Sequence, residues 1–388
     1  MGERGPSPRK KTRPLETETR KVAIAAKIAT THPERSRPAS SRKSSRIGQR
    51  RTQARKGISS HRCARGTSAV VDALLDQAVG LLRAGGVVGL PTETVYGLAA
   101  LASQEHAVRR IFAIKRRPSN HPLIVHLASA DAVDRWAKNV PDVARTLARA
   151  FWPGPLTLVL ERTAVASDAV TGGQDTVALR VPDHPLALEL LRRLDDGLAA
   201  PSANRFGKLS PTTAQHVRDD LGADVDLVLD GGPCAVGVES TIVDCSKGAP
   251  RVLRPGGVSG QALAAALGHE VPVAVASDVR VPGALPSHYA PRAGLILTTA
   301  ERLADEVAQR QSWGAQVAVL SAGAPPLPPG TLLHAWSADP AEAARTLYAA
   351  LRELDARGVD VVVAVPPAEG GLGQAVRDRL QRAAAPRG

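Results

Sequence analysis

Residues 71–90 read VDALLDQAVGLLRAGGVVGL, and this stretch decides the fold class. Its apolar positions first recur every three or four residues, which is the period of a helix buried along one side. Gly85 and Gly86 then interrupt the pattern, and the apolar run Val87–Leu90 is typical of a buried strand. A helix that leads through a glycine turn into a strand indicates an α/β protein.

The same alternation continues along the chain. Ser103 can cap a helix that ends at Ile114, Asp183 can cap one that ends at Leu194, and Thr212 with Gln215 forms a capping box. Further apolar runs predict strands at residues 123–127, 156–160 and 176–181. This pattern predicts an α/β fold rather than a helix bundle or a β-sandwich.

A second, shorter α/β series occupies the C-terminal part of the sequence. It predicts strands at 295–297, 317–320 and 359–365, alternating with helices at 301–310, 341–354 and 374–383. The prolines and glycine between residues 281 and 292 predict a linker. We therefore expect a larger domain at 67–280 and a smaller α/β domain at 293–388.

The net charge of +13 is concentrated at the N-terminus. Residues 1–66 contain 19 Lys or Arg and 4 Asp or Glu, a net of +15, so residues 67–388 carry −2. The first 66 residues have no apolar period, and we predict a disordered basic extension. It could be a nucleic-acid-binding arm, an organelle transit peptide or a translated upstream segment without function. We favour the last, because a transit peptide should lack the four acidic residues.

The cysteines and the apolar runs constrain the cellular setting. Cys63, Cys234 and Cys245 show no metal-ligand spacing, and an odd number cannot form a complete set of internal disulfides. No apolar run reaches the roughly 18 residues that a membrane span needs. We therefore expect a cytoplasmic protein that does not enter a membrane and has no protein metal site.

Cations follow the helix that is predicted to end near Ile114. Lys115, Arg116 and Arg117 precede Pro118, which breaks the helix where the three charges are presented. They could complement the helix end and contact water, or they could form a phosphate or carboxylate site between two buried elements. In the strand at 176–181, Thr176, Ala178 and Arg180 share the face opposite Val177, Leu179 and Val181.

At this point the sequence resembles a known family, the YrdC-like threonylcarbamoyl-AMP synthases in their long, two-domain form. The matching segments are Pro91-Thr92-Glu93-Thr94-Val95-Tyr96-Gly97-Leu98, Lys115-Arg116-Arg117-Pro118, Phe151-Trp152-Pro153-Gly154-Pro155-Leu156-Thr157, Arg180-Val181-Pro182-Asp183-His184-Pro185, Ala200-Pro201-Ser202-Ala203-Asn204, Gly237-Val238-Glu239-Ser240-Thr241-Ile242, Leu253-Arg254-Pro255-Gly256, His288-Tyr289-Ala290-Pro291 and Asp378-Arg379-Leu380. The likeness covers about residues 68–388. It implies a YrdC-like twisted mixed sheet with helices, followed by a smaller Rossmann-like domain.

The resemblance also implies an activity. Members of this family form threonylcarbamoyl-AMP and pyrophosphate from L-threonine, bicarbonate or CO2, and ATP. Magnesium is expected to arrive with ATP, and no tightly bound cofactor is expected. A tRNA threonylcarbamoyl transferase is the expected recipient of the product. Such a reaction requires positioning and charge stabilisation more than a covalent side chain.

The resemblance assigns roles to particular residues. Lys115 and Arg117 would be catalytic, holding the ATP phosphates and the developing charge. The other implied ATP-binding residues are His121, Thr176, Ser202, Asn204, Ser210, Arg254 and Tyr289. The implied threonine-binding residues are Thr94, His126, Arg180, Ala200 and Ser240. For His121 the alternative is a solvated loop histidine, and for His126 it is a satisfied core histidine. The segment 281–292, which contains Tyr289, would act as a lid.

Three other functions compete with this assignment. YrdC-like domains resemble double-stranded RNA binders in shape, so weak RNA binding is one alternative, although a body of charge −2 offers little attraction for phosphates. A carbamoyl transferase of hydrogenase maturation is disfavoured because its zinc-finger cysteines are missing here. A regulatory protein with a dead ATP site is disfavoured because every charged motif residue is present. A GxxxxGK[ST] phosphate-binding loop is also missing.

Overall fold

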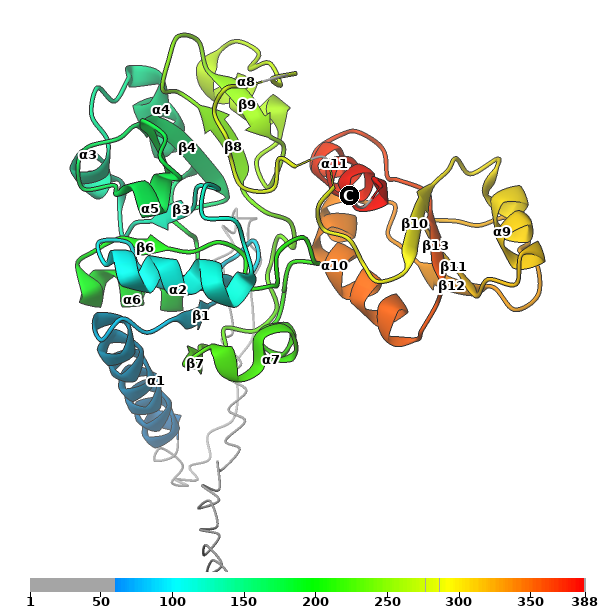
Figure 1. Ribbon diagram of the computed structural model, residues 1–388, viewed down its shortest axis with the longest axis horizontal. Coiled ribbons are helices and arrows are strands. Elements are labelled where there is room, and N and C mark those ends of the chain that lie inside the picture. Colours follow the sequence, from blue (N-terminus) through cyan, green and yellow to red (C-terminus); the bar gives the residue numbers. More distant parts are fainter. Residues whose placement is uncertain (1–59, 276, 286, 387–388) are drawn as a thin grey trace, which may run out of the picture. The chain divides into compact units, whose positions relative to one another are not determined.

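The computed structural model describes residues 60–275, 277–285 and 287–386 (Figure 1). In helix α1 the side chains are described from residue 69. The predicted basic extension lies outside these ranges except for residues 60–66. Those residues belong to helix α1, Ser60–Arg83, which begins seven residues before the predicted start of the larger domain at residue 67. The stretch 60–66 contains no proline, and its arginines and alanine favour a helix.

In the described residues, the larger domain contains eight α-helices and nine strands. Its helices are α1 Ser60–Arg83, α2 Glu105–Lys115, α3 Val133–Trp136, α4 Asp142–Phe151, α5 Asp168–Thr171, α6 Pro185–Leu194, α7 Ala214–Leu221 and α8 Gly260–Leu267. Its strands are β1 Val88–Leu90, β2 Gly97–Leu101, β3 Ile124–His126, β4 Leu156–Glu161, β5 Thr176–Arg180, β6 Leu198–Ala199, β7 Leu227–Val228, β8 Thr241–Asp244 and β9 Arg251–Arg254.

These strands form one sheet in the order β7-β1-β2-β6-β3-β5-β4-β8-β9. Neighbouring strands run both ways: β3 is parallel to β5 and β4 to β8, whereas β2, β6 and β3 are successively antiparallel. The mixed sheet implied by the resemblance is confirmed. One face packs under α1 and α6, where Leu75, Leu82 and Leu190 are buried together, and the other face carries the cluster around Trp136 and Ile111.

Three predicted helix caps are wrong in detail. The side chain of Ser103 bonds to Asp196, and α2 begins after Gln104. Helix α6 begins with Pro185, after His184, because proline suits the first helical turn. The cap of α7 is Thr213, whose hydroxyl accepts from the backbone NH of His216. Each error is one residue, since several neighbouring polar residues could serve as caps.

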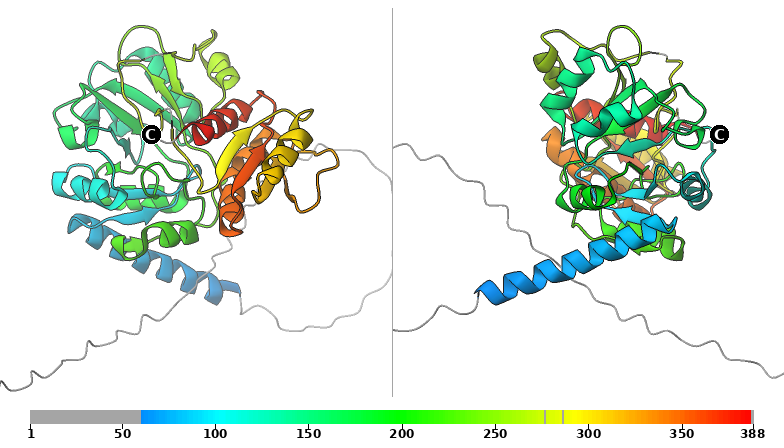
Figure 2. Two further views of the ribbon diagram at one scale, coloured as in Figure 1. Left: turned by 45° about the vertical axis from the view of Figure 1, so that its right-hand side comes forward. Right: turned by 90° about the vertical axis from the view of Figure 1, so that its left-hand side faces the viewer.

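The smaller domain is a four-stranded sheet with three helices. Its elements are β10 Gly294–Leu297, α9 Leu303–Ser312, β11 Val317–Ser321, β12 Leu332–Ala335, α10 Pro340–Ala356, β13 Val361–Ala364 and α11 Gly373–Ala384. The strand order is β10-β13-β11-β12, and every pair is parallel. Helix α9 covers one face, and α10 and α11 cover the other (Figures 1 and 2). The predicted Rossmann-like domain is confirmed, although the sequence did not predict the exposed edge strand β12.

A close backbone contact at Gly256 provides a test of this fold. A Cβ atom there would lie 2.3 Å from the carbonyl oxygen of Glu239 and 2.4 Å from the nitrogen of Thr241. We predict that Gly256→Ala lowers the free energy of unfolding by about 1–3 kcal/mol, measured by urea denaturation. Gly260→Ala is the control, since nothing lies within 4 Å of its added Cβ and it sits at the start of α8. Equal stability of the two variants would contradict this packing.

Candidate functional site

A small cavity of about 50 Å³ lies at the carboxyl ends of the parallel strands β3 and β5. The last residues of these strands, His126 and Arg180, are register partners. A bridge between Gly97 and Ser202 forms a further part of its wall. The lining residues are Thr92, Val95, Gly97, Arg117, Ile124, His126, Arg180, Ala200, Pro201, Ser202, Glu239, Ser240, Arg254, Pro282, Gly283, His288 and Tyr289.

Lys115 and Arg117 are both buried, which decides against the solvated alternative for these two cations. Lys115 Nζ donates to the carbonyl oxygens of Ser202 and Asn204, each at 2.5 Å. Burial, together with the charge of Arg117, holds the pKa of Lys115 well below its usual value. Arg117 donates through Nη2 to the carbonyl oxygen of Pro122, and burial lowers its pKa to about 10. Both side chains thus lie where water compensates their charge poorly.

Arg180 and His126 lie at the strand ends. Arg180 pairs with the buried carboxylate of Glu93 at 2.7 Å and donates through Nε to the carbonyl oxygen of Gly154. Burial and the neighbouring Arg180 lower the pKa of His126 to about 3, so this histidine is neutral at pH 7. The alternative of a satisfied core histidine is disfavoured, because His126 Nδ1 is buried without a hydrogen-bond partner.

Arg254 forms the opposite wall together with Ser240. Its guanidinium donates to the carbonyl oxygen of Ser240 and to that of Pro282, both at 2.8 Å. The hydroxyl of Ser240 is in turn hydrogen-bonded to that of Thr157 at 2.8 Å. Behind this wall, the hydroxyl of Ser210 donates to Glu239 at 2.6 Å. Ser240 and Arg254 are therefore held in one hydrogen-bonded group, and Ser210 is held by the neighbouring residue Glu239.

The charges in this site do not balance. Within the described residues, Lys115, Arg117 and Arg254 have no carboxylate at ion-pair distance, whereas Glu93 and Glu239 are each paired with an arginine. Arg117 Nε, Arg254 Nε, His126 Nδ1 and Asn204 Oδ1 are also buried without partners. Buried cations and unsatisfied donors carry a large desolvation cost. The arrangement is therefore suited to binding an anion.

The segment between the domains covers the cavity. Tyr289 is 2% exposed and adopts the left-handed conformation with φ of 60°. Its neighbour His288 has a pKa lowered to about 3 by burial, and the backbone of Ala290 donates to the carbonyl oxygen of Gly207. Only glycine fits at 283, because an added Cβ would lie 2.0 Å from the Tyr289 hydroxyl oxygen. This close packing of the segment explains the small volume of the cavity.

Most residues singled out by the sequence meet at this cavity. Arg117, His126, Arg180, Ala200, Ser202, Ser240, Arg254 and Tyr289 line it, and Lys115, Asn204, Ser210 and Thr94 lie directly behind its wall. His121 is half-buried at the margin, with its ring 5.5 Å from that of Phe206. The structure does not bring Thr176 to the cavity. Thr176 is the first residue of β5 and Arg180 is the last, so the two residues lie about 13 Å apart along the strand.

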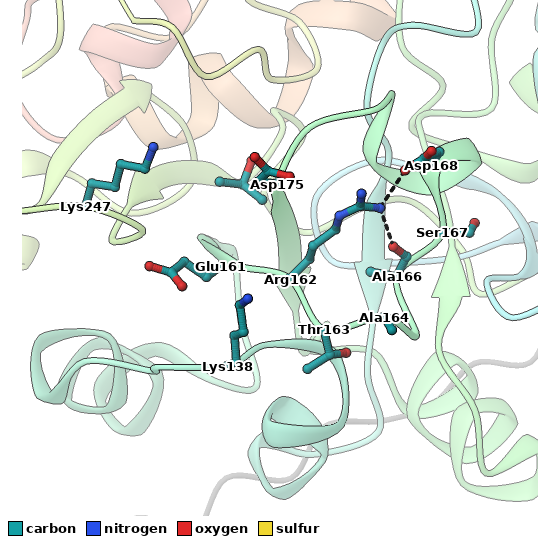
Figure 3. A pocket seen from close by; sticks show the side chains of 11 residues that line it. Lys138, Glu161, Arg162, Thr163, Ala164, Ala166, Ser167, Asp168, Asp175 and Lys247 are labelled. Atoms are coloured by element: carbon teal, nitrogen blue, oxygen red, sulfur yellow. Dashed lines mark hydrogen bonds and ion pairs between the residues drawn. The ribbon is translucent and has the colours of Figure 1, made fainter.

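Thr176 instead lines a larger, more open cavity of about 630 Å³ (Figure 3). Lys138, Lys247, Glu161 and Asp175 project from its rim, and Arg162 contacts Asp168 and the carbonyl oxygen of Ala166. Charges of both signs are mixed here and most of these side chains are exposed. Size alone therefore does not make this the better candidate.

Several residues of the site were not predicted. Thr92, Glu239 and His288 lie in motifs that the sequence analysis quoted, and their place beside the selected residues Thr94, Ser240 and Tyr289 was the available signal. Arg379 and Tyr348 reach Glu239 from the smaller domain. No spacing pattern indicates a contact between residues this far apart in the chain.

Comparison with known proteins agrees with this geometry. A family model described as "Telomere recombination", for the Sua5, YciO and YrdC proteins, matches residues 80–256, and one described as "Threonylcarbamoyl-AMP synthase, C-terminal domain" matches residues 258–385. A threonylcarbamoyl-AMP synthase of Pyrococcus abyssi is 41% identical over 325 residues, which is 79% of this chain and 92% of that protein. The chain belongs to the threonylcarbamoyl-AMP synthase family.

A second relative and a solved structure extend the comparison. The threonylcarbamoyl-AMP synthase of Bacillus subtilis is 39% identical, covering 81% of this chain and 93% of its own length. The crystal structure of P. abyssi Sua5 complexed with L-threonine superimposes with a TM-score of 0.76 at 40% identity, covering 80% of this chain and 94% of that one. Both domains are therefore shared with these relatives. The described residues contain no helix long and apolar enough to cross a membrane.

Proposed function

We infer that this chain is an L-threonylcarbamoyladenylate synthase, which transfers an AMP group from ATP to carboxylated L-threonine and releases pyrophosphate. The observation that carries this inference is the group of buried, unpaired cations, Lys115, Arg117 and Arg254, beside the Arg180–His126 pair. Family membership, with a threonine-bound relative, supports the same activity.

The proposed reaction proceeds in two steps. The amino group of threonine first attacks bicarbonate or CO2 to give an N-carboxylate. With bicarbonate the other product is water, and with CO2 it is a proton released to solvent. A carboxylate oxygen then attacks the α-phosphorus of ATP, and the bond between the α-phosphorus and the bridging oxygen breaks, so that pyrophosphate leaves. Lys115, Arg117 and Arg254 would stabilise the phosphate charge, and Arg180 would bind the threonine carboxylate.

Burial strengthens the stabilisation of phosphate charge by these cations. In a site that excludes water, a cation stabilises developing negative charge more strongly than at the surface. A bound phosphate would also raise the pKa of Lys115 again, because it supplies an opposite charge where burial has removed the hydrating water. We further propose that segment 281–292 is a lid, since the cavity it covers is smaller than a nucleotide and the segment must move before ATP enters.

Further parts of the proposal concern what the site binds. Within the described residues no cluster of metal-ligating side chains is found, and the nearby carboxylates of Glu93 and Glu239 are engaged by arginines. Magnesium would therefore enter as part of the MgATP substrate, held by phosphates and water. We also propose bicarbonate as co-substrate, a tRNA threonylcarbamoyl transferase as recipient of the product, and the cytoplasm as the location.

The alternative, a double-stranded RNA-binding module of the same fold, is less well supported. Lys115, Arg117 and Arg254 are buried, so they do not form a basic surface along which a nucleic-acid backbone could lie. Residues 67–388 carry a net charge of −2, so nonspecific attraction to RNA phosphates should be weak.

Omission of single substrates tests the proposed reaction. We predict that pyrophosphate release from ATP requires both L-threonine and bicarbonate, because the nucleophile is formed from the two together. Release would be measured with a coupled phosphate assay in bicarbonate-depleted buffer. Undiminished pyrophosphate release without threonine would exclude the assignment.

Substitution of the two buried cations tests their role. We predict that Lys115→Ala and Arg117→Ala each lower kcat/KM for ATP by at least about 100-fold, because each removes a charge that stabilises the transferred phosphate. Arg116→Gln is the matched control, since Arg116 lies between them but is exposed. Its activity should remain within about twofold of the unaltered chain. Folded Lys115 and Arg117 variants that retain full turnover would contradict this account.

A further inference from the structure

We propose that Arg379, which comes from the C-terminal domain, is a positioning residue for the nucleotide side of the site. It neutralises Glu239 and packs against Tyr289, so that the charge of Arg254 remains available to phosphate. This inference rests on the proposed function, because it concerns how the same site binds ATP.

Arg379 is 1% exposed, although it carries a full charge. Its Nε donates to Glu239 Oε2 at 2.6 Å, and its Nη2 donates to the carbonyl oxygen of Pro255 at 3.0 Å. The guanidinium carbon lies 5.0 Å from the centre of the Tyr289 ring, within the range of a cation–π contact. One side chain of α11 therefore contacts the wall of the cavity, the end of β9 and the covering segment.

Glu239 is the centre of this arrangement. It lines the cavity, and its carboxylate accepts hydrogen bonds from Ser210, Tyr348 and Arg379. Burial by itself would raise the pKa of Glu239, but Arg379 and Arg254 outweigh that effect and hold the pKa at about 2. The carboxylate is therefore charged, and two of its three donors come from the C-terminal domain.

A charged carboxylate in this wall is unfavourable for a site that binds polyphosphate, unless another cation compensates it. Arg254 donates to both the carbonyl and the hydroxyl oxygen of Ser240, the neighbour of Glu239 in the chain. Without Arg379, the nearest cation able to compensate Glu239 would be Arg254. Arg254 would then compensate Glu239 and would no longer be available to bind the nucleotide, so the wall would attract phosphate less. The C-terminal domain thus supplies the cation that compensates Glu239, although its side chains lie behind the cavity.

The threonine side should be much less affected. Arg180 has its own partner in Glu93, and neither residue contacts Arg379 in the described structure. The proposal therefore predicts different effects on the binding of the two substrates. Loss of Arg379 should weaken ATP binding specifically, whereas a general loss of folding would impair both substrates.

The test compares Arg379→Gln with the unaltered full-length chain. We expect KM for ATP, and Kd for a non-hydrolysable ATP analogue measured by calorimetry, to rise about tenfold or more, with KM for threonine changed less than about threefold. Adding Glu239→Gln to this variant should recover most of the loss, since it removes the uncompensated carboxylate. Equal losses for both substrates, or no recovery in the double variant, would overturn the proposal.

Two further variants serve as a control and as a substitute for Arg379→Gln. Arg352→Gln is the matched control, because Arg352 also joins the domains, through Asp220 at 2.6 Å and the carbonyl oxygen of Leu209, without contacting Glu239. It should leave KM for ATP within about twofold. If Arg379→Gln does not fold, Tyr348→Phe removes a single donor to Glu239 and should still raise KM for ATP by about twofold to fivefold. An unchanged KM in that variant would count against the proposal.

The design also separates this inference from the proposed function. If the unaltered chain releases no pyrophosphate with threonine and bicarbonate, the proposed function fails. Affinity for the ATP analogue then still reports on Arg379. If the unaltered chain is active and Arg379→Gln binds the analogue equally well, only the positioning role fails.

Discussion

The structure depends on buried positive charge that the protein itself does not neutralise. Arg117 and Arg254 line one small cavity, Lys115 lies directly behind its wall, and the two carboxylates nearby are paired with other arginines. Such charges destabilise a folded chain unless dipoles and hydrogen bonds compensate them. The carbonyl oxygens of Ser202, Asn204, Ser240 and Pro282 provide part of that compensation. A bound anion would provide the rest, and for this reason the site favours phosphate.

The fold explains how these charges are brought together. His126 and Arg180 end neighbouring parallel strands, Arg254 ends β9, and Lys115 ends α2, so these four side chains are held by regular structure. Arg117 lies two residues beyond the end of α2. The covering segment and the C-terminal domain close the site from behind, through Tyr289, Tyr348 and Arg379. Helices and strands hold the side chains at their ends, whereas a linker holds Tyr289. The linker is therefore the part best suited to open. Catalysis would then require the two domains to act together.

Many helices, strands and site residues could be predicted from the sequence, because they depend on patterns among residues close together in the chain. The alternation in strand 176–181 correctly separated Arg180 from the core residues Val177 and Leu179, and the break at Pro118 correctly placed cations at the end of a helix. The position of Thr176 was harder, since a shared strand face does not reveal which end of the strand meets the site. The Glu239–Arg379 contact joins residues 140 positions apart, which no local pattern can indicate. The short edge strand β12 was missed because its exposed leucines have no alternating pattern.

The most direct test of the central claim is a crystal structure of the chain with L-threonine and a non-hydrolysable ATP analogue. The account predicts phosphate oxygens within hydrogen-bonding distance of Arg117 and Arg254, and the threonine carboxylate at Arg180. A nucleotide bound at the open cavity beside Lys138 and Lys247, with Arg117 Nε and Arg254 Nε still without partners, would contradict it.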